Sequence, residues 1–404
     1  MTGWPARIDS LLGELGRNVT AATRAVRSLL GDDPVEVLAY RGYGDASRAH
    51  VYGRVLEKPG VGASTDADST LRNLLNTWRR AESDPIAFAR VRVEYAGTAH
   101  EIRADDEGFF GGWIVPDIPV VTDAEWTRYE ATVVSSLPVG IEAAKGAGEI
   151  LLPGPTARFG VISDIDDTVI QSRVSNFLQA ARTVMLGNAR TRLPFPGVAA
   201  FYQALRNGAS GNERNPVFYV SSSPWNIYDV ITEFMDLQEV PRGPLLLRDW
   251  DISLGSLASE RHYEHKGAAI RDILQLYANM PFMLIGDTSQ HDPEIYKDIV
   301  SEFPDRIRAI YIRDVTGTAT RQSAVKELAR QVLAAGSVLV LAEDTLGAAR
   351  HAAEQGWIDA NALPDVQKEK RADEGRDGTK APAPDGGEPT SGSAPTVIGA
   401  AGTA

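Results

Sequence analysis

The stretch after Arg158 alternates short apolar runs with helical segments, and this alternation restricts the fold more than any other feature of the chain. The apolar runs cover residues 159–162, 217–220, 282–285, 307–312 and 338–341, and the helical segments cover 197–206, 227–237, 266–277, 293–302 and 320–334. Strands that are apolar on both faces belong in a parallel sheet covered by crossover helices. We therefore predict an α/β domain with a doubly wound parallel sheet over residues 153–362.

The preceding residues, 33–152, have a different pattern, with short alternating or apolar stretches separated by turn residues. Strands are predicted at 35–40, 50–56, 90–95, 113–115 and 129–135, and one helix at 71–81. The segment 90–115 resembles the small β-sandwich modules of the transthyretin-like or carboxypeptidase-regulatory kind. We expect a smaller β-sandwich-like accessory domain with a targeting, scaffolding or dimerising role.

The two ends of the chain differ from both domains. Apolar residues recur at helical spacing over residues 4–30, which predicts an amphipathic helix within an N-terminal segment 1–32. That helix lies either on a membrane surface or against its own domain, and base rates favour the second. Residues 363–404 are rich in Ala, Pro, Gly and charged residues, which predicts a disordered tail.

Composition excludes several classes of function. The formal net charge of −13 disfavours general binding to nucleic acid, which requires clustered Lys and Arg. The chain has no cysteine, so disulfides and zinc–thiolate sites are excluded. No secretory signal and no apolar run of about 20 residues is present. We expect a cytoplasmic protein, with peripheral membrane contact left open.

Carboxylates cluster where the first apolar strand of the α/β region ends. Asp164, Asp166 and Asp167 occur within four residues directly after that strand. Like charges at such short range repel unless a cation lies between them, and Mg²⁺ would also organise a phosphate. The alternatives are an acidic helix cap or a calcium loop, but the glycine and terminal glutamate spacing of a calcium loop is absent.

Further polar groups follow the next elements along the chain. Ser221 and Ser222 end the second apolar strand, Lys266 lies near a predicted helix start, and Asp287 and Asp292 follow the third strand. Each has a simple alternative explanation: a serine-rich loop, a solvated lysine, and a helix start before Pro293 for Asp292. Because ligands bind beyond the carboxyl ends of parallel strands, the joint pattern predicts one active site at that edge.

This ordered set resembles the haloacid-dehalogenase superfamily of phosphatases. The segments 164–169, 219–226, 241–250 and 286–294 are similar to the actin-patch-type phosphatidate phosphatase family, a relative of the lipins. The resemblance covers about residues 158–355. It implies a haloacid-dehalogenase-like fold and a phosphatase that converts phosphatidate to diacylglycerol and phosphate.

The resemblance also implies a role for each matching residue. Asp164 is the expected nucleophile that forms an aspartyl-phosphate, and Asp166 the expected general acid and base. Ser221, Ser222 and Lys266 are expected to bind the phosphoryl group of the substrate. The expected ligands of Mg²⁺ are Asp164, the main-chain carbonyl of Asp166, Asp287 and Asp292.

The substrate is less closely defined than the chemistry. The inserts at 169–216 and 225–265 are short, which suits a partly open site that takes its phosphomonoester from a membrane or a macromolecule. Trp225 and the apolar residues Phe177, Leu178, Met185 and Leu186 form either a rim of that site or part of the core. The alternatives are a phosphatase of phosphoproteins or nucleotides and a catalytically silent module that binds lipid phosphate.

Overall fold

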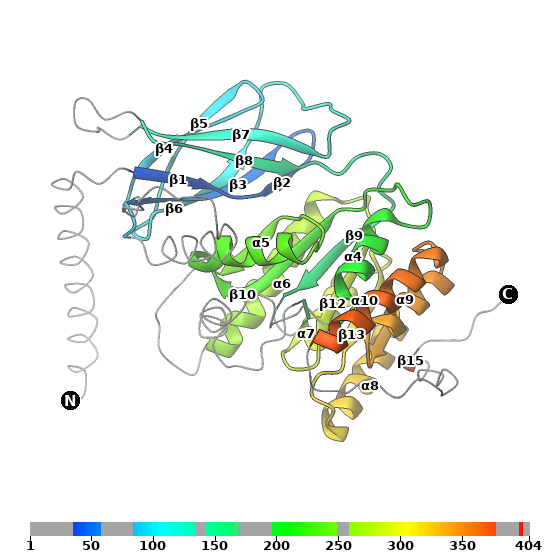
Figure 1. The fold of residues 1–404 in the computed structure, drawn as a ribbon. Coiled ribbons are helices and arrows are strands. Elements are labelled where there is room, and N and C mark those ends of the chain that lie inside the picture. Colours follow the sequence, from blue (N-terminus) through cyan, green and yellow to red (C-terminus); the bar gives the residue numbers. More distant parts are fainter. Residues whose placement is uncertain are drawn as a thin grey trace, which may run out of the picture. The chain divides into compact units, whose positions relative to one another are not determined.

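The computed structural model describes residues 35–57, 84–134, 143–165, 168–169, 196–248, 258–376 and 396–398. The described residues fall into two compact units, with the boundary between Leu152 and Pro153. Each unit has its own sheet, and Figure 1 shows the elements of both. The helices predicted at 4–30 and 71–81 lie outside the described residues.

The described residues of the first unit form eight strands, which are hydrogen-bonded into one mostly antiparallel sheet. Its strands are β1 (Val35–Ala39), β2 (Gly42–Gly44), β3 (Ala49–Glu57), β4 (Arg90–Tyr95), β5 (Thr98–Arg103), β6 (Phe109–Ile114), β7 (Trp126–Val133) and β8 (Lys145–Leu151). Their order is β1-β3-β2-β8-β7-β4-β5, with β6 paired to β3. The predicted strands therefore exist, and three of them extend or shift by a few residues.

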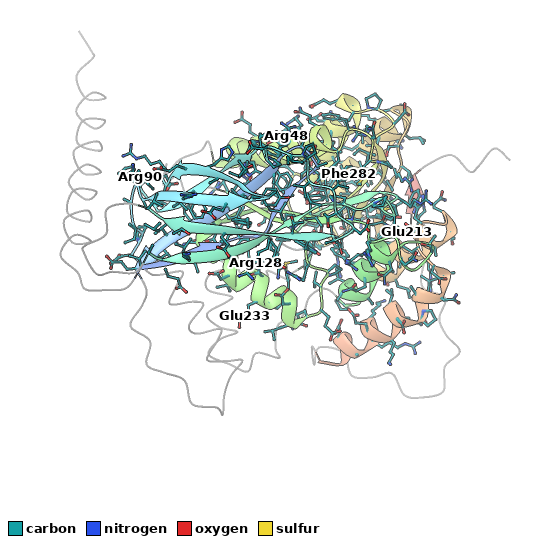
Figure 2. The ribbon with its side chains drawn as sticks, turned by 90° about the horizontal axis from the view of Figure 1, so that it is seen from above. Arg48, Arg90, Arg128, Glu213, Glu233 and Phe282 are labelled. Carbon is teal, nitrogen blue, oxygen red and sulfur yellow. The ribbon has the colours of Figure 1, made fainter. Side chains whose placement is uncertain are left out.

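Alternating burial along these strands explains why their polar residues do not disturb the core. In β7, Tyr129 and Ala131 are buried, whereas Arg128 and Glu130 are exposed. Figure 2 shows Arg128 and Arg90 on the outside of the strands. One apolar face and one polar face are typical of an antiparallel sheet with water on one side.

The second unit contains the predicted parallel sheet. Its strands are β9 (Gly160–Asp164), β10 (Val217–Pro224), β11 (Leu245–Arg248), β12 (Phe282–Asp287), β13 (Ile307–Arg313), β14 (Leu339–Ala342) and β15 (Thr396–Ile398). The order is β11-β10-β9-β12-β13-β14-β15, and only β15 is antiparallel to its neighbour. Every residue of β9 and β12 is buried, as expected for central strands of a parallel sheet. The strand order reverses at β9, which brings the ends of β9 and β12 side by side.

Helices connect and cover these strands. They are α4 (Val198–Asn207), α5 (Tyr228–Leu237), α6 (Ala258–Leu276), α7 (Asp292–Glu302), α8 (Ala319–Ala334), α9 (Thr345–Glu354) and α10 (Leu363–Arg376). The helix predicted at 266–277 begins earlier, at Ala258, so Lys266 lies in its interior rather than near its first turn. Among the described residues, no helix combines the length and the apolar content needed to cross a bilayer.

The chain is helical from Leu363 to Arg376, where we expected the disordered tail to begin. The helix is polar, but its carboxylates bind the N-terminus of α4. Glu369 accepts hydrogen bonds from the N–H groups of Ala199 (3.1 Å) and Ala200 (2.9 Å), and Asp373 accepts one from Gly197 (3.0 Å). The first N–H groups of a helix have no partner within it, so these contacts stabilise both helices.

We expect the variant Glu369→Ala to lower the free energy of unfolding by about 1–2 kcal/mol. It removes the acceptor of two N–H groups of α4, and the cap residue Gly197 has no side chain to replace it. Chemical denaturation measures the change. Glu327→Ala is the control, because Glu327 forms an exposed ion pair with Arg330 on α8, and its loss should cost no more than about 0.5 kcal/mol. Equal losses in the two variants would contradict the prediction.

Candidate active site

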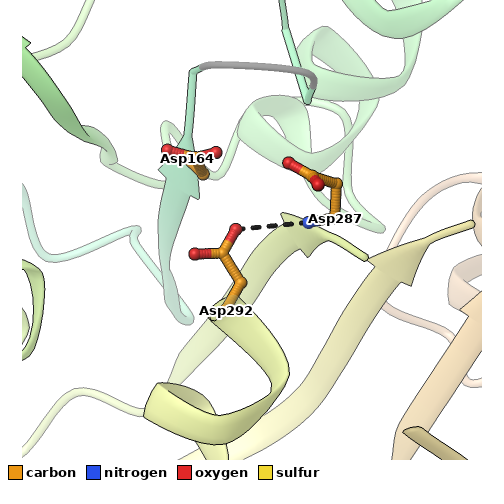
Figure 3. Close-up of side chains that lie close together, drawn as sticks. All are labelled: Asp164, Asp287 and Asp292. Atoms are coloured by element: carbon orange, nitrogen blue, oxygen red, sulfur yellow. Dashed lines mark hydrogen bonds between the residues drawn. The ribbon is translucent and has the colours of Figure 1, made fainter. Parts of the chain in front are cut away.

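Three buried carboxylates meet at the carboxyl edge of the parallel sheet (Figure 3). Asp164 ends β9, Asp287 ends the neighbouring strand β12, and Asp292 begins α7. Each offers an oxygen atom, and these atoms lie within 4.8 Å of one another. The side chains are almost completely shielded from water, with residue exposures of 1%, 0% and 0%. Neighbouring parallel strands end at the same edge, so the fold itself produces this cluster.

A glycine allows Asp292 to approach the end of β12. A Cβ atom at Gly286 would lie only 2.4 Å from Oδ2 of Asp292. The same Oδ2 atom accepts a hydrogen bond from the backbone N–H of Asp287 at 3.2 Å. Any side chain at Gly286 would therefore displace Asp292 from the cluster.

Lys266 reaches the carboxylates from α6. Its Nζ atom lies 3.0 Å from Oδ1 of Asp164 and 2.6 Å from Oδ1 of Asp292. The lysine is 2% exposed. Burial acts to lower the pKa of Lys266, but the negative charges of Asp164 and Asp292 outweigh it and hold this pKa well above its ordinary value. Lys266 is therefore a permanent cation of the cluster.

The cluster still has an excess of negative charge. Three carboxylates and one ammonium group leave two negative charges when all are ionised. Burial, followed by the charge of Asp292, raises the pKa of Asp287 to about 6. A divalent cation would relieve this repulsion, and three carboxylates are the oxygen ligands that hard cations such as Mg²⁺ prefer. The residues present thus fit a divalent metal ion.

The predicted serines lie within β10, the strand next to β9, because this strand continues past the expected end at Val220 to Pro224. Val220 is the register partner of Asp164, so Ser221 lies one residue beyond that pair. Ser221 is fully buried, and its Oγ atom accepts a hydrogen bond from the N–H of Ser223 at 3.0 Å. The hydroxyl of Ser222 is also buried, and it has no hydrogen-bond partner among the residues that the structure describes.

Two predicted groups are not seen at the site. Asp166 lies outside the described residues, as do Phe177, Leu178, Met185 and Leu186 of the suggested apolar rim. Trp225 is described, but it is only 6% exposed and stacks on Tyr228 at a ring distance of 6.0 Å. Trp225 is therefore a core residue rather than part of an open rim.

Other residues contact the cluster but were not singled out from the sequence. Thr168 donates a hydrogen bond to Oδ2 of Asp287 at 3.3 Å, and Gln290 accepts one from Lys266 at 3.4 Å. Thr168 and Gln290 are close in sequence to the aspartates, and that closeness could have identified them as candidate site residues. Tyr202 binds Ser163 at 2.7 Å, and Ser163 donates to the backbone oxygen of Asp164 at 2.6 Å. No pattern in the neighbouring sequence predicts that Tyr202 contacts β9.

Comparison with known proteins identifies the segment that carries this site. Residues 159–314 match the family model described as the catalytic domain of phosphatidate phosphatase APP1. Phosphatidate phosphatase APP1 of Saccharomyces cerevisiae is 30% identical over 155 residues, which are 38% of this chain and 25% of the yeast protein. An uncharacterized protein of Schizosaccharomyces pombe is 29% identical over 157 residues, again 38% of this chain and 25% of the relative. The chain thus spans a quarter of the length of these curated relatives.

Among solved structures, a carbohydrate acetylesterase from Xanthomonas citri covers 74% of this chain at 11% identity, and 65% of that protein is covered in turn. The TM-score is 0.24. All three aspartates and Lys266 lie within the segment 159–314 of the family match.

Proposed function

We propose that this chain, whose residues 159–314 belong to the catalytic-domain family of phosphatidate phosphatase APP1, is a Mg²⁺-dependent phosphatase that hydrolyses phosphatidate to diacylglycerol and phosphate. The observation that carries the proposal is the buried cluster of Asp164, Asp287 and Asp292 with Lys266. An excess of buried negative charge destabilises a folded protein, so such a cluster has a functional explanation in cation and phosphate chemistry.

In the proposed reaction Asp164 is the nucleophile. Its carboxylate oxygen forms a bond to phosphorus while the bond from phosphorus to the diacylglycerol oxygen breaks, which leaves an aspartyl-phosphate. Asp166 gives its proton to the departing oxygen. It then takes a proton from the water that attacks the aspartyl-phosphate, and phosphate leaves with Asp164 restored.

The remaining residues orient the reacting groups. Lys266 holds the Asp164 carboxylate by an ion pair, and its ammonium group together with the hydroxyls of Ser221 and Ser222 binds the phosphoryl oxygens. Mg²⁺ held by Asp164, the main-chain carbonyl of Asp166, Asp287 and Asp292 would neutralise the charge that spreads over those oxygens. We also propose that residues 153–362 have a haloacid-dehalogenase-like fold.

Phosphate release from two substrates tests the proposal. Phosphatidate in mixed micelles and a soluble aryl phosphate are compared with added Mg²⁺ and with a chelator. We expect faster release from phosphatidate, and a fall of roughly 100-fold or more with the chelator, since a bound metal contributes several kcal/mol to such transition states. Restored release after Mg²⁺ is added back is the control.

The other outcomes support the alternatives. Faster release from the aryl phosphate would indicate a phosphatase of another phosphomonoester. Binding of phosphatidate micelles without any phosphate release would indicate a catalytically silent module that recognises lipid phosphate. Release that the chelator does not change would contradict the role of the metal.

A further inference from the structure

Arg321, in the first turn of α8, contacts the loop that joins two of the site's aspartates. Its Nε atom donates to the backbone oxygen of Thr288 at 3.0 Å, and its Nη2 atom donates to the backbone oxygen of Gln290 at 2.7 Å. Arg321 lies outside the segment 159–314 that matches the catalytic-domain family. Neither its position in the sequence nor the comparison points to a role at the site.

The loop that Arg321 contacts, residues 288–291, determines how far apart two of the carboxylates lie. It begins directly after Asp287, at the end of β12, and ends directly before Asp292, at the start of α7. Backbone groups between two such elements need partners from side chains or water. The guanidinium group of Arg321 supplies partners to the carbonyls on both sides of Ser289.

The same loop also holds the side chains of the cluster. The N–H of Ser289 donates a hydrogen bond to Oδ1 of Asp287. The side-chain oxygen of Gln290 accepts one from Lys266 at 3.4 Å. A shift of the loop backbone would therefore move an aspartate, the lysine contact and the start of α7 together.

Arg321 is itself held in one orientation. Both oxygens of Glu294, in the first turn of α7, accept hydrogen bonds from its guanidinium group, one of them at 3.0 Å. Thr288 provides a second attachment, because its Oγ atom accepts from the N–H groups of Val315 (3.0 Å) and Thr316 (3.2 Å), which precede α8. The loop is thus connected to the start of α8 at two points.

We propose that Arg321 is a positioning residue of the cation site, which sets the affinity for Mg²⁺ by holding Asp287 and Asp292 at the separation that one ion requires. The inference rests on the proposed metal-dependent function. A guanidinium group can bind two carbonyls and a carboxylate in fixed directions, whereas a lysine ammonium is a point charge without that geometry. Arg321→Lys therefore removes the positioning and keeps the positive charge.

The test compares Arg321→Lys with Arg271→Lys. Arg271 also forms two hydrogen bonds to one carboxylate: it lies in α6 and binds Glu302 of α7 at 2.6 Å and 2.6 Å. Among the described residues, it makes no hydrogen bond to the loop 288–291. Titration calorimetry with MgCl₂ alone measures the affinity without substrate. We expect Arg321→Lys to weaken Mg²⁺ binding by about 10–100-fold, as is typical when a residue that orients metal ligands is changed, and Arg271→Lys to leave it unchanged.

Kinetics supply a second readout. The Mg²⁺ concentration for half-maximal phosphate release should rise by the same factor in Arg321→Lys, while kcat at saturating Mg²⁺ stays within about threefold of the wild-type value, since the reacting groups are intact. If Arg321→Lys fails to fold, Glu294→Gln is measured instead. It loosens the anchor of Arg321 and should weaken Mg²⁺ binding in the same direction.

Each contrary result has one meaning. Unchanged Mg²⁺ affinity in Arg321→Lys, or in Glu294→Gln when that variant replaces it, overturns the inference and leaves the proposed function intact. An equal loss in Arg271→Lys also overturns it, because a general loosening of the helices would then be the cause. A wild-type protein that binds no Mg²⁺ overturns the metal-dependent function and this inference together.

Discussion

Replacement of Asp164 by asparagine is expected to lower the rate of phosphate release by roughly 10⁴-fold or more, the size of effect seen when a nucleophile is removed. Asparagine has nearly the same shape as aspartate, but its amide cannot form the bond to phosphorus that the reaction requires. Asp164 is 1% exposed and lies at the end of β9, so the change is confined to the site. Steady-state phosphate release from phosphatidate micelles measures it.

The control for this variant is Asp272→Asn, on the exposed face of α6. It makes the same chemical change outside the cluster and should release phosphate at the wild-type rate. Circular dichroism of both variants checks that the fold is retained. Turnover by Asp164→Asn within tenfold of the wild-type rate would remove Asp164 from the role of nucleophile.

Replacement of Lys266 by methionine is expected to lower the free energy of unfolding by about 3–5 kcal/mol when no divalent cation is present. The lysine is fully buried between Asp164 and Asp292. Without it, the carboxylates stay buried with no opposing charge, and that loss is much larger than the loss of an exposed ion pair. Denaturation by urea in the presence of a chelator measures the difference.

Addition of Mg²⁺ extends this test. The cluster has one more uncompensated negative charge in Lys266→Met, so Mg²⁺ should raise the stability of this variant more than that of the wild type. Lys297→Met is the control, because Lys297 pairs with Asp298 where both side chains are partly exposed, and its loss should cost no more than about 1 kcal/mol. Equal destabilisation in the two lysine variants would show that the buried ion pairs of Lys266 stabilise the protein no more than a partly exposed ion pair does.

The carboxylate cluster was predictable because both of its determinants are local in the sequence. Continuous apolar runs identify the central strands, and Asp164 and Asp287 are the last residues of two of them. A parallel sheet places such strand ends at one edge, so the proximity of these aspartates follows from the pattern itself.

The helices show where local patterns were insufficient. The helix that carries Lys266 begins at Ala258, not near Lys266 as predicted, and the lysine reaches the carboxylates from the helix interior. Likewise, the polar sequence of α10 has too few apolar residues to predict a docked helix. Its carboxylates find partners at the N-terminus of α4, more than a hundred residues earlier in the chain.

The sequence by itself determined the parallel sheet and the strand ends that carry Asp164 and Asp287, since burial and alternation depend on neighbouring residues. The tertiary structure alone decided that Lys266 pairs with two carboxylates and that Arg321 binds the loop between Asp287 and Asp292. These contacts join elements that are distant in sequence, and their geometry depends on how the helices pack, which no local pattern encodes.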